Sequence, residues 1–171
     1  FELYCQLLRQ SVARLKGDVE VVRVTAFTRG VGAAVRKAVA TTGAAGQPGS
    51  AGIVLDLRGN PGGLLTEAVE VASAFLDGGA VVSYEKRGEP VHHLDAVGSG
   101  DTTVPLVVLV DGGTASAAEV VAAALQDRNR ALIVGTDSFG KGSVQTVIPL
   151  QGGRDGALRL TTARYYTHAG R

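Results

Sequence analysis

A serine and a lysine lie in two segments of the chain where together they could cleave an acyl bond. Ser116 opens an alanine-rich stretch, and Lys141 follows 25 positions later at the end of a glycine-bearing loop. A serine hydroxyl is a weak nucleophile until a base removes its proton, and a lysine can be that base only when it is neutral. Because lysine ordinarily ionises at about pH 10.4, its surroundings must disfavour the cation, as apolar burial does. We therefore regard Ser116 as a candidate nucleophile and Lys141 as its general base.

Neighbouring residues are candidates for the other tasks of such a site. Val134, Phe139 and Val144 are apolar residues close to Lys141 in the sequence and are candidates for burying it. A tetrahedral intermediate also needs preorganised donors for its oxyanion, commonly backbone N–H groups. Ala117 follows Ser116 at an expected helix start, where N–H groups lack helical partners and the helix dipole favours negative charge. The Ala117 amide is thus a candidate oxyanion donor.

Each of these residues also has a plainer interpretation. Ser116-Ala117-Ala118-Glu119 is a capping-box pattern, in which Ser116 only caps its helix and Glu119 returns the bond. Thr114 is an alternative cap that would free the serine hydroxyl. Lys141 taken alone is typical of a surface charge, and the Asn-Pro-Gly-Gly sequence at 60–63 is typical of a turn.

Two glycine-bearing loops partly imitate nucleotide-binding signatures. Residues 30–35 follow an expected strand and open an expected helix, with Asp56 downstream, but the sixth position is valine where glycine or alanine is required. Residues 135–141 match the first seven positions of a phosphate-binding loop. The segment after them reads as a strand, whereas a phosphate site requires a helix start there. We expect ordinary turns at both places.

Histidine and cysteine give little support to a metal site or a histidine-based triad. His92, His93 and His168 are the only histidines, and no carboxylates lie near them at ligand spacing. The single cysteine, Cys5, excludes an intramolecular disulfide and is expected to be a small buried hydrophobe. We therefore predict no metal and no cofactor.

Strands and helices alternate along most of the chain, which predicts an α/β fold. Apolar spacings of three and four from Phe1 to Leu15 predict an amphipathic helix over residues 1–16. Further helices are predicted over 31–39, 64–76 and 115–126, and strands over 19–27, 53–57, 81–84, 106–110, 131–134, 144–150 and 157–166. The strands at 53–57 and 131–134 are expected to be buried, and residues 85–103 to form a surface excursion.

The composition describes one compact domain and excludes some classes of partner. The chain has 171 residues, 45% of them hydrophobic, and a formal net charge of +1. That charge gives no reason to expect nucleic acid or an anionic membrane as a partner. No apolar run reaches the roughly 18 residues of a membrane-spanning helix, and the start of the chain lacks the pattern of a secretory signal.

Four segments occur in order along the chain: DLRGNPGGLL at 56–65, GTASAAE at 113–119, SFGKGSVQ at 138–145 and GALRLTTARYYT at 156–167. Together they resemble the signature of the carboxyl-terminal processing proteases, also called tail-specific proteases, and the resemblance covers residues 19–171. It implies a mixed β-sheet flanked by helices, similar to the core of these proteases and of their distant crotonase-like relatives.

The resemblance also implies an activity and roles for single residues. It implies a serine endopeptidase that hydrolyses peptide bonds near the C-terminus of protein substrates, with Gln145 orienting Lys141. It assigns the second oxyanion donor, beside Ala117, to the Gly62 amide. It implies a protein or peptide as the partner and a periplasmic location, with the thylakoid lumen of algal and plant relatives as the alternative. The competing hypothesis is an inactive peptide-binding or assembly module of the same fold, and phosphate binding at 135–141 is a weaker one.

The sequence departs from the family pattern at both ends. Residues 1–18 form an unassigned segment, expected to be helical, and residues 19–171 form the protease core. We see no segment of the size of the PDZ domain that usually precedes this core, and members typically continue beyond the position of Arg171. Thr167-His168-Ala169-Gly170 also stands where Thr-Pro-Ser-Gly is usual. These departures leave Ser116 and Lys141 in place but bear on how a substrate would be captured.

Overall fold

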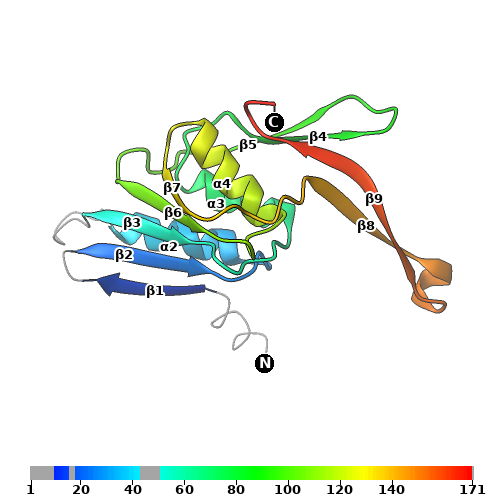
Figure 1. The fold of residues 1–171 in the computed structure, drawn as a ribbon, viewed down its shortest axis with the longest axis horizontal. Coiled ribbons are helices and arrows are strands. Elements are labelled where there is room, and N and C mark those ends of the chain that lie inside the picture. Colours follow the sequence, from blue (N-terminus) through cyan, green and yellow to red (C-terminus); the bar gives the residue numbers. More distant parts are fainter. Residues whose placement is uncertain (1–9, 16–17, 43–50, 171) are drawn as a thin grey trace.

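The computed structural model describes residues 10–15, 18–42 and 51–170. Its larger sheet has five strands in the order β1-β2-β3-β6-β7 (Figure 1). The strands are β1 (Gln10–Leu15), β2 (Val19–Val24), β3 (Gly52–Asp56), β6 (Leu106–Val110) and β7 (Leu132–Gly135). β1 is antiparallel to β2, and the other neighbouring pairs are parallel. The predicted mixed sheet is therefore confirmed.

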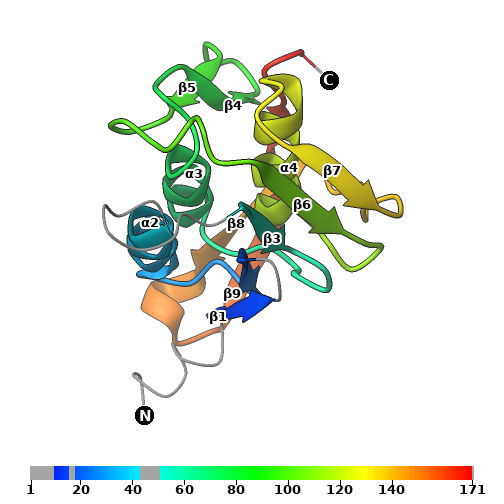
Figure 2. The same ribbon diagram turned by 90° about the vertical axis from the view of Figure 1, so that its left-hand side faces the viewer.

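Three helices pack against this sheet and close the core. They are α2 (Val31–Thr42), α3 (Leu65–Ser73) and α4 (Ala117–Asp127), seen together in Figures 1 and 2. Because the parallel strands follow chain order across the sheet, right-handed crossovers bring all three helices to one face. Phe27, Phe75, Leu55 and Leu125 are fully buried between the helices and the sheet. None of the helices within 18–42 and 51–170 has the length and apolar character needed to cross a membrane.

A second, antiparallel sheet has the order β5-β4-β9-β8. Its strands are β4 (Ala80–Lys86), β5 (His92–Asp95), β8 (Ser143–Pro149) and β9 (Ala157–Tyr166). β8 and β9 form a long hairpin that projects from the body of the molecule and ends in a short 3-10 turn, Leu150–Gly153 (Figure 1). β8 begins two residues after Lys141, so the base of this hairpin lies beside the candidate site.

The N-terminal prediction is wrong where the structure describes it. Residues 10–15 form strand β1, which pairs with β2 from Gln10 opposite Val24 to Leu15 opposite Val19. The pairing satisfies backbone groups on an edge of β2 that a helix at this place would leave open. The spacing of apolar residues within one short segment does not show that β2 has an unpaired edge nearby. Residues 1–9, which carry the rest of the predicted helix, lie outside the described residues.

Strand β7 is present where the sequence predicts a strand, but it is not buried. Leu132 is 66% exposed and Val134 is 43% exposed. β7 is the last strand of its sheet and therefore has one neighbour, β6. β3, between two neighbours, is buried as expected, with Ile53 and Leu55 both below 2% exposure. The excursion at 85–103 contains the predicted surface residues and one short strand, β5.

Candidate active site

Ser116 occupies a strained turn between β6 and α4. Its backbone angles, φ 56° and ψ −119°, are unusual for a residue with a side chain. Such a conformation costs roughly 1–3 kcal/mol and persists only where the surroundings impose it. Here Ser116 N–H donates to Glu119 Oε2 at 2.7 Å, and Ala115 N–H donates to Asn60 O at 2.9 Å. A serine on a strained strand-to-helix turn at the carboxyl end of a parallel strand is the arrangement of a nucleophile elbow.

Asp111 ties the glycine-rich loop after β3 to the turn that carries Ser116. Its Oδ1 accepts from Gly59 N–H at 2.8 Å and from Gly113 N–H at 2.9 Å. These backbone donors, Gly59 first, hold the pKa of Asp111 below its usual range. Thr114 adds a second link, because its hydroxyl donates to Leu57 O and accepts from Asp111 N–H, both at 2.9 Å. Thr114 is therefore not the alternative cap of α4 that the sequence allowed.

Gly62, whose amide the resemblance assigns as the second oxyanion donor, lies close to Ser116. A Cβ atom at Gly62 would lie 2.8 Å from Ser116 Cβ and 3.0 Å from Ala117 N, and its φ is +102°, so a side chain is excluded there. The Gly62 N–H, however, donates to Asn60 Oδ1 at 2.8 Å. Asn60 is itself fully buried and donates to Val24 O. In this conformation the Gly62 amide is engaged inside the protein.

The Ala117 amide differs from that of Gly62. Among the hydrogen bonds of the described residues, none is donated by Ala117 N–H, which belongs to the first residue of α4. The N–H groups of a first helical turn have no partner within the helix and favour a negative charge. Within the described residues, this N–H group therefore has no acceptor.

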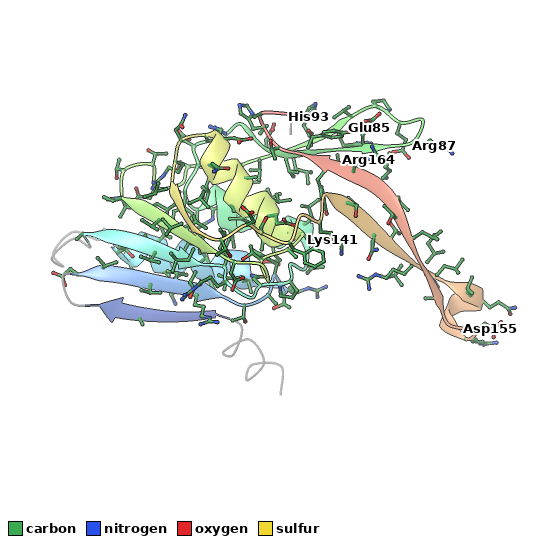
Figure 3. The ribbon with its side chains drawn as sticks, in the orientation of Figure 1. Glu85, Arg87, His93, Lys141, Asp155 and Arg164 are labelled. Atoms are coloured by element: carbon green, nitrogen blue, oxygen red, sulfur yellow. The ribbon has the colours of Figure 1, made fainter. Side chains whose placement is uncertain are left out.

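Ser116 and Lys141 line the same cavity, which has a volume of about 480 Å³. Lys141 is half-buried at the entry to the β8–β9 hairpin, near the N-terminal end of α4 (Figure 3). Val120, Ile133 and Tyr165 provide apolar surface in this cavity. None of the three apolar residues expected near Lys141 (Val134, Phe139 and Val144) lines the cavity, and Val134 and Phe139 are 43% and 68% exposed.

The Glu119 carboxylate is the polar centre of the site. Its Oε2 accepts from Ser116 N–H at 2.7 Å and from Lys141 N–H at 2.9 Å. Its Oε1 accepts from Ser138 Oγ and Gly140 N–H, each at 2.7 Å. The sequence assigned Glu119 only a return bond in a capping box, and its contacts with residues 138–141 depend on the tertiary fold.

Of the five predicted site residues, Ser116 and Lys141 line the cavity, whereas Gly62, Ala117 and Gln145 do not. Gln145 is exposed on β8. Gln126, Asp137 and Tyr165 do line the cavity and were not predicted. Tyr165 lies within the segment 156–167 that contributed to the resemblance, and Asp137 lies in the loop 135–141 that imitates a phosphate-binding signature. Nothing in the local sequence indicated Gln126.

The two loops that imitate nucleotide sites are filled by carboxylates. Glu67 accepts from Gly30 N–H at 3.0 Å and from Gly32 N–H at 2.9 Å, which places a side-chain anion at the start of α2. A Cβ at Gly32 would overlap Glu70 Cβ, so this glycine permits close packing of α2 on α3. In the second loop, the amides of residues 140 and 141 bind Glu119, and strand β8 follows where a helix would be required. Ordinary turns explain both patterns.

None of the histidines that the structure describes lines this cavity. The His92 ring stacks on Tyr84 with centroids 4.9 Å apart, and its Nε2 lies 3.1 Å from Glu89 Oε2 on the surface hairpin β4–β5. Neither His93 nor His168 lines the cavity. Within residues 10–15, 18–42 and 51–170, no group of histidine, cysteine and carboxylate side chains could hold a metal ion. Cys5 lies outside the described residues.

Comparison with known proteins shows that this chain is similar to peptidases. The model of "Peptidase family S41" matches residues 18–171. The carboxy-terminal-processing protease of Bartonella bacilliformis is 49% identical over 161 residues, which are 92% of this chain and 36% of that protein. The chloroplastic C-terminal processing peptidase of Tetradesmus obliquus is 41% identical over 157 residues, 91% of this chain and 32% of that protein. The chain thus spans about a third of the length of these relatives.

Solved structures give the same result. The photosystem II D1 C-terminal processing protease superposes with a TM-score of 0.76 at 38% identity, over 92% of this chain and 41% of that one. An S41 protease from Bacteroides fragilis superposes with a TM-score of 0.76 over 95% of this chain and 46% of that one. Its 20% identity supports the shared fold alone.

Proposed function

The chain belongs to peptidase family S41, and on this premise we propose that it is the catalytic core of a serine endopeptidase that cleaves proteins near their C-terminus. The observation that carries the proposal is the strained backbone of Ser116 in a cavity that Lys141 also lines. The strain is compatible with a helix cap but is not needed for one, since ordinary cap residues adopt β-region angles. A nucleophile elbow, by contrast, requires a strained backbone at its serine.

The proposed reaction passes through an acyl-enzyme. Ser116 Oγ attacks the scissile carbonyl carbon while neutral Lys141 Nζ takes the hydroxyl proton. Lys141 then delivers that proton to the leaving amine, the C–N bond breaks, and an ester remains on Ser116. Water attacks the ester with Lys141 as base, which releases the new C-terminal carboxylate and restores the serine.

Three further groups are proposed to assist. The Ala117 N–H is positioned as one oxyanion donor, with the Gly62 N–H as the second. Because Gly62 now donates to Asn60 Oδ1, this role requires its amide to be shared with the oxyanion or to turn toward it when substrate binds. Gln145 is proposed to orient Lys141, which requires its side chain to turn from its exposed position on β8 toward the cavity.

We propose the periplasm as the place of action. Residues 156–167 resemble the corresponding strand of bacterial members, and the relative that is 49% identical is from the bacterium Bartonella bacilliformis. The relatives from Tetradesmus obliquus and Arabidopsis thaliana are named chloroplastic, which supports the thylakoid lumen as the alternative.

Cleavage of an unfolded model protein by the wild-type chain, with products identified by mass spectrometry, tests this function. We expect Ser116→Ala and Lys141→Ala each to lower kcat by at least about 10³-fold, because each group takes part in the same step. Lys37→Ala on the exposed face of α2 and Ser99→Ala on a surface loop are the matched controls and should cleave like the wild type. A folded wild type that neither cleaves the protein nor becomes acylated at Ser116 by a fluorophosphonate would instead favour the inactive peptide-binding module.

A further inference from the structure

We propose that Glu119 is a positioning residue that sets the distance between the nucleophile and the base. Its carboxylate joins two separate parts of the site: the elbow at Ser116 and the loop at residues 138–141 that ends in Lys141. This inference rests on the proposed function, because it gives Glu119 its task through Ser116 and Lys141. It assigns to Glu119 a positioning role in addition to the helix-capping role that the sequence pattern indicates.

The four contacts use both carboxylate oxygens. Oε2 accepts from the backbone N–H of Ser116 and of Lys141, at 2.7 and 2.9 Å, so a single oxygen atom joins the main chains of the two candidate catalytic residues. Oε1 accepts from Ser138 Oγ and Gly140 N–H, each at 2.7 Å. Donor–acceptor distances this short are typical of hydrogen bonds to an ionised acceptor.

The loop that carries Lys141 has few other attachments to the body. Residues 138–140 are exposed, with Phe139 at 68%. Apart from Glu119, the backbone is held by Phe139 N–H to Thr114 O at 2.9 Å and by Thr136 N–H to Val110 O at 3.3 Å, and just after Lys141 by Tyr165 N–H to Gly142 O at 3.0 Å. Glu119 lies one turn along α4 from Ser116, on a helix whose inner face is buried, and is therefore a rigid reference point for this exposed loop.

The chemistry of the contact distinguishes positioning from capping. Glutamine serves as well as glutamate in a capping box, since one carbonyl oxygen is enough for the return bond. Four donors on two oxygens require a carboxylate, because an amide nitrogen in place of one oxygen would face N–H or O–H donors and accept from none of them. Glu119→Gln should therefore keep the return bond from Ser116 N–H through its remaining oxygen and release the Ser138–Gly140 side of the contact.

Steady-state kinetics of the full chain on the unfolded protein substrate is the first test. We expect Glu119→Gln to lower kcat by about 100-fold with KM changed less than about 3-fold, because the base is displaced while the cavity remains. Ser138→Ala, which removes one donor and leaves the carboxylate, should lower kcat only several-fold. Glu67→Gln is the matched control, because the Glu67 carboxylate also accepts from backbone N–H groups, those of Gly30 and Gly32, but does not line the cavity. This variant should leave kcat unchanged.

Hydrogen–deuterium exchange of residues 136–142 is the second test, and it does not depend on activity. The amides of Gly140 and Lys141 should both be protected in the wild type. In Glu119→Gln the amide of Gly140 should exchange about tenfold faster, with little change in melting temperature. Wild-type kcat or unchanged exchange in Glu119→Gln would overturn the inference. Protected amides in a wild type that cleaves nothing would instead count against the proposed function and leave the positioning contact standing.

Discussion

At the scale of single residues, buried polar groups fix the loops of the site. Asp56 ends β3 with an exposed fraction of 3%, and both of its oxygens accept from the Arg58 side chain at 2.9 Å. These hydrogen bonds from Arg58 hold the pKa of Asp56 below its usual value of 3.8, although burial acts to raise it. The ion pair thereby fixes the start of the loop that leads to Gly62.

This pair predicts a pH-dependent contribution to stability. Because the folded-state pKa of Asp56 is depressed, its stabilising contribution is fully present above the unfolded value near 3.8 and is lost as the pH falls through the lower folded value. At pH 7, Asp56→Asn should lower the free energy of unfolding by about 2 kcal/mol, the usual effect of losing hydrogen bonds to a charged group. Urea unfolding followed from pH 7 to pH 2 should show the two curves converging below about pH 4.

The control for Asp56 is Asp155→Asn at the tip of the projecting hairpin (Figure 3), which should match the wild type across this range. A difference between Asp56→Asn and the wild type that stays constant down to pH 2 would show that the charge of Asp56 is not what stabilises the loop.

At the scale of elements, the approach of α2 to α3 depends on one missing side chain. Gly32 lies in the first turn of α2 and is buried, and a Cβ there would overlap Glu70 Cβ on α3. In most helices a glycine-to-alanine change is stabilising by up to about 1 kcal/mol. Here we expect Gly32→Ala to destabilise by about 1–3 kcal/mol, because the two helices must separate to admit the methyl group.

Thermal unfolding of Gly32→Ala beside Gly142→Ala measures this effect. A Cβ at Gly142 meets no atom within 4 Å, so that variant should stay within about 0.5 kcal/mol of the wild type. If Gly32→Ala proved as stable as the wild type or more so, the helices would be shown to pack less closely than the structure describes.

At the scale of the whole molecule, a compact core carries one long projecting hairpin. The β8–β9 hairpin shows exposed apolar side chains, including Val147 at 63% and Leu158 and Leu160 at 46%. Its tip, residues 150–156, is exposed throughout, whereas the helices and the central strands β3 and β6 are largely buried. Local opening should therefore occur at the tip long before the core unfolds.

Limited proteolysis with trypsin checks this expectation. We predict the first cleavage after Arg154, at the exposed tip, leaving the body of the molecule intact. Arg130 should resist, because its side chain donates to Phe75 O, Asp101 O and Val104 O on the body of the protein. Early cleavage after Arg130, detected by mass spectrometry, would contradict this order of local stability.

Most elements of the fold were predictable, because their signals are local. Apolar runs predicted β3 and β6, and the alternation of strands with helices predicted the α/β layering. Four motifs in order, two of which contain Ser116 and Lys141, indicated the carboxyl-terminal processing proteases, and the comparisons confirm this relationship. Glycines at the turn after β3 likewise indicated a tight loop, and Gly62 does contact the serine.

Only the tertiary structure decided features that depend on neighbours distant in the sequence. An apolar segment does not show whether its strand is central or at an edge of the sheet, so β7 was expected to be buried although it is exposed. The apolar spacing of residues 1–16 likewise predicted a helix, because it does not show that β2 offers an open edge with which residues 10–15 pair as β1. The contact of Glu119 with the loop of Lys141 and the use of the Gly62 amide by Asn60 depend on how separate loops meet. Hydrogen bonds between residues far apart in the sequence are determined by tertiary packing, and the local propensities of the residues do not predict them.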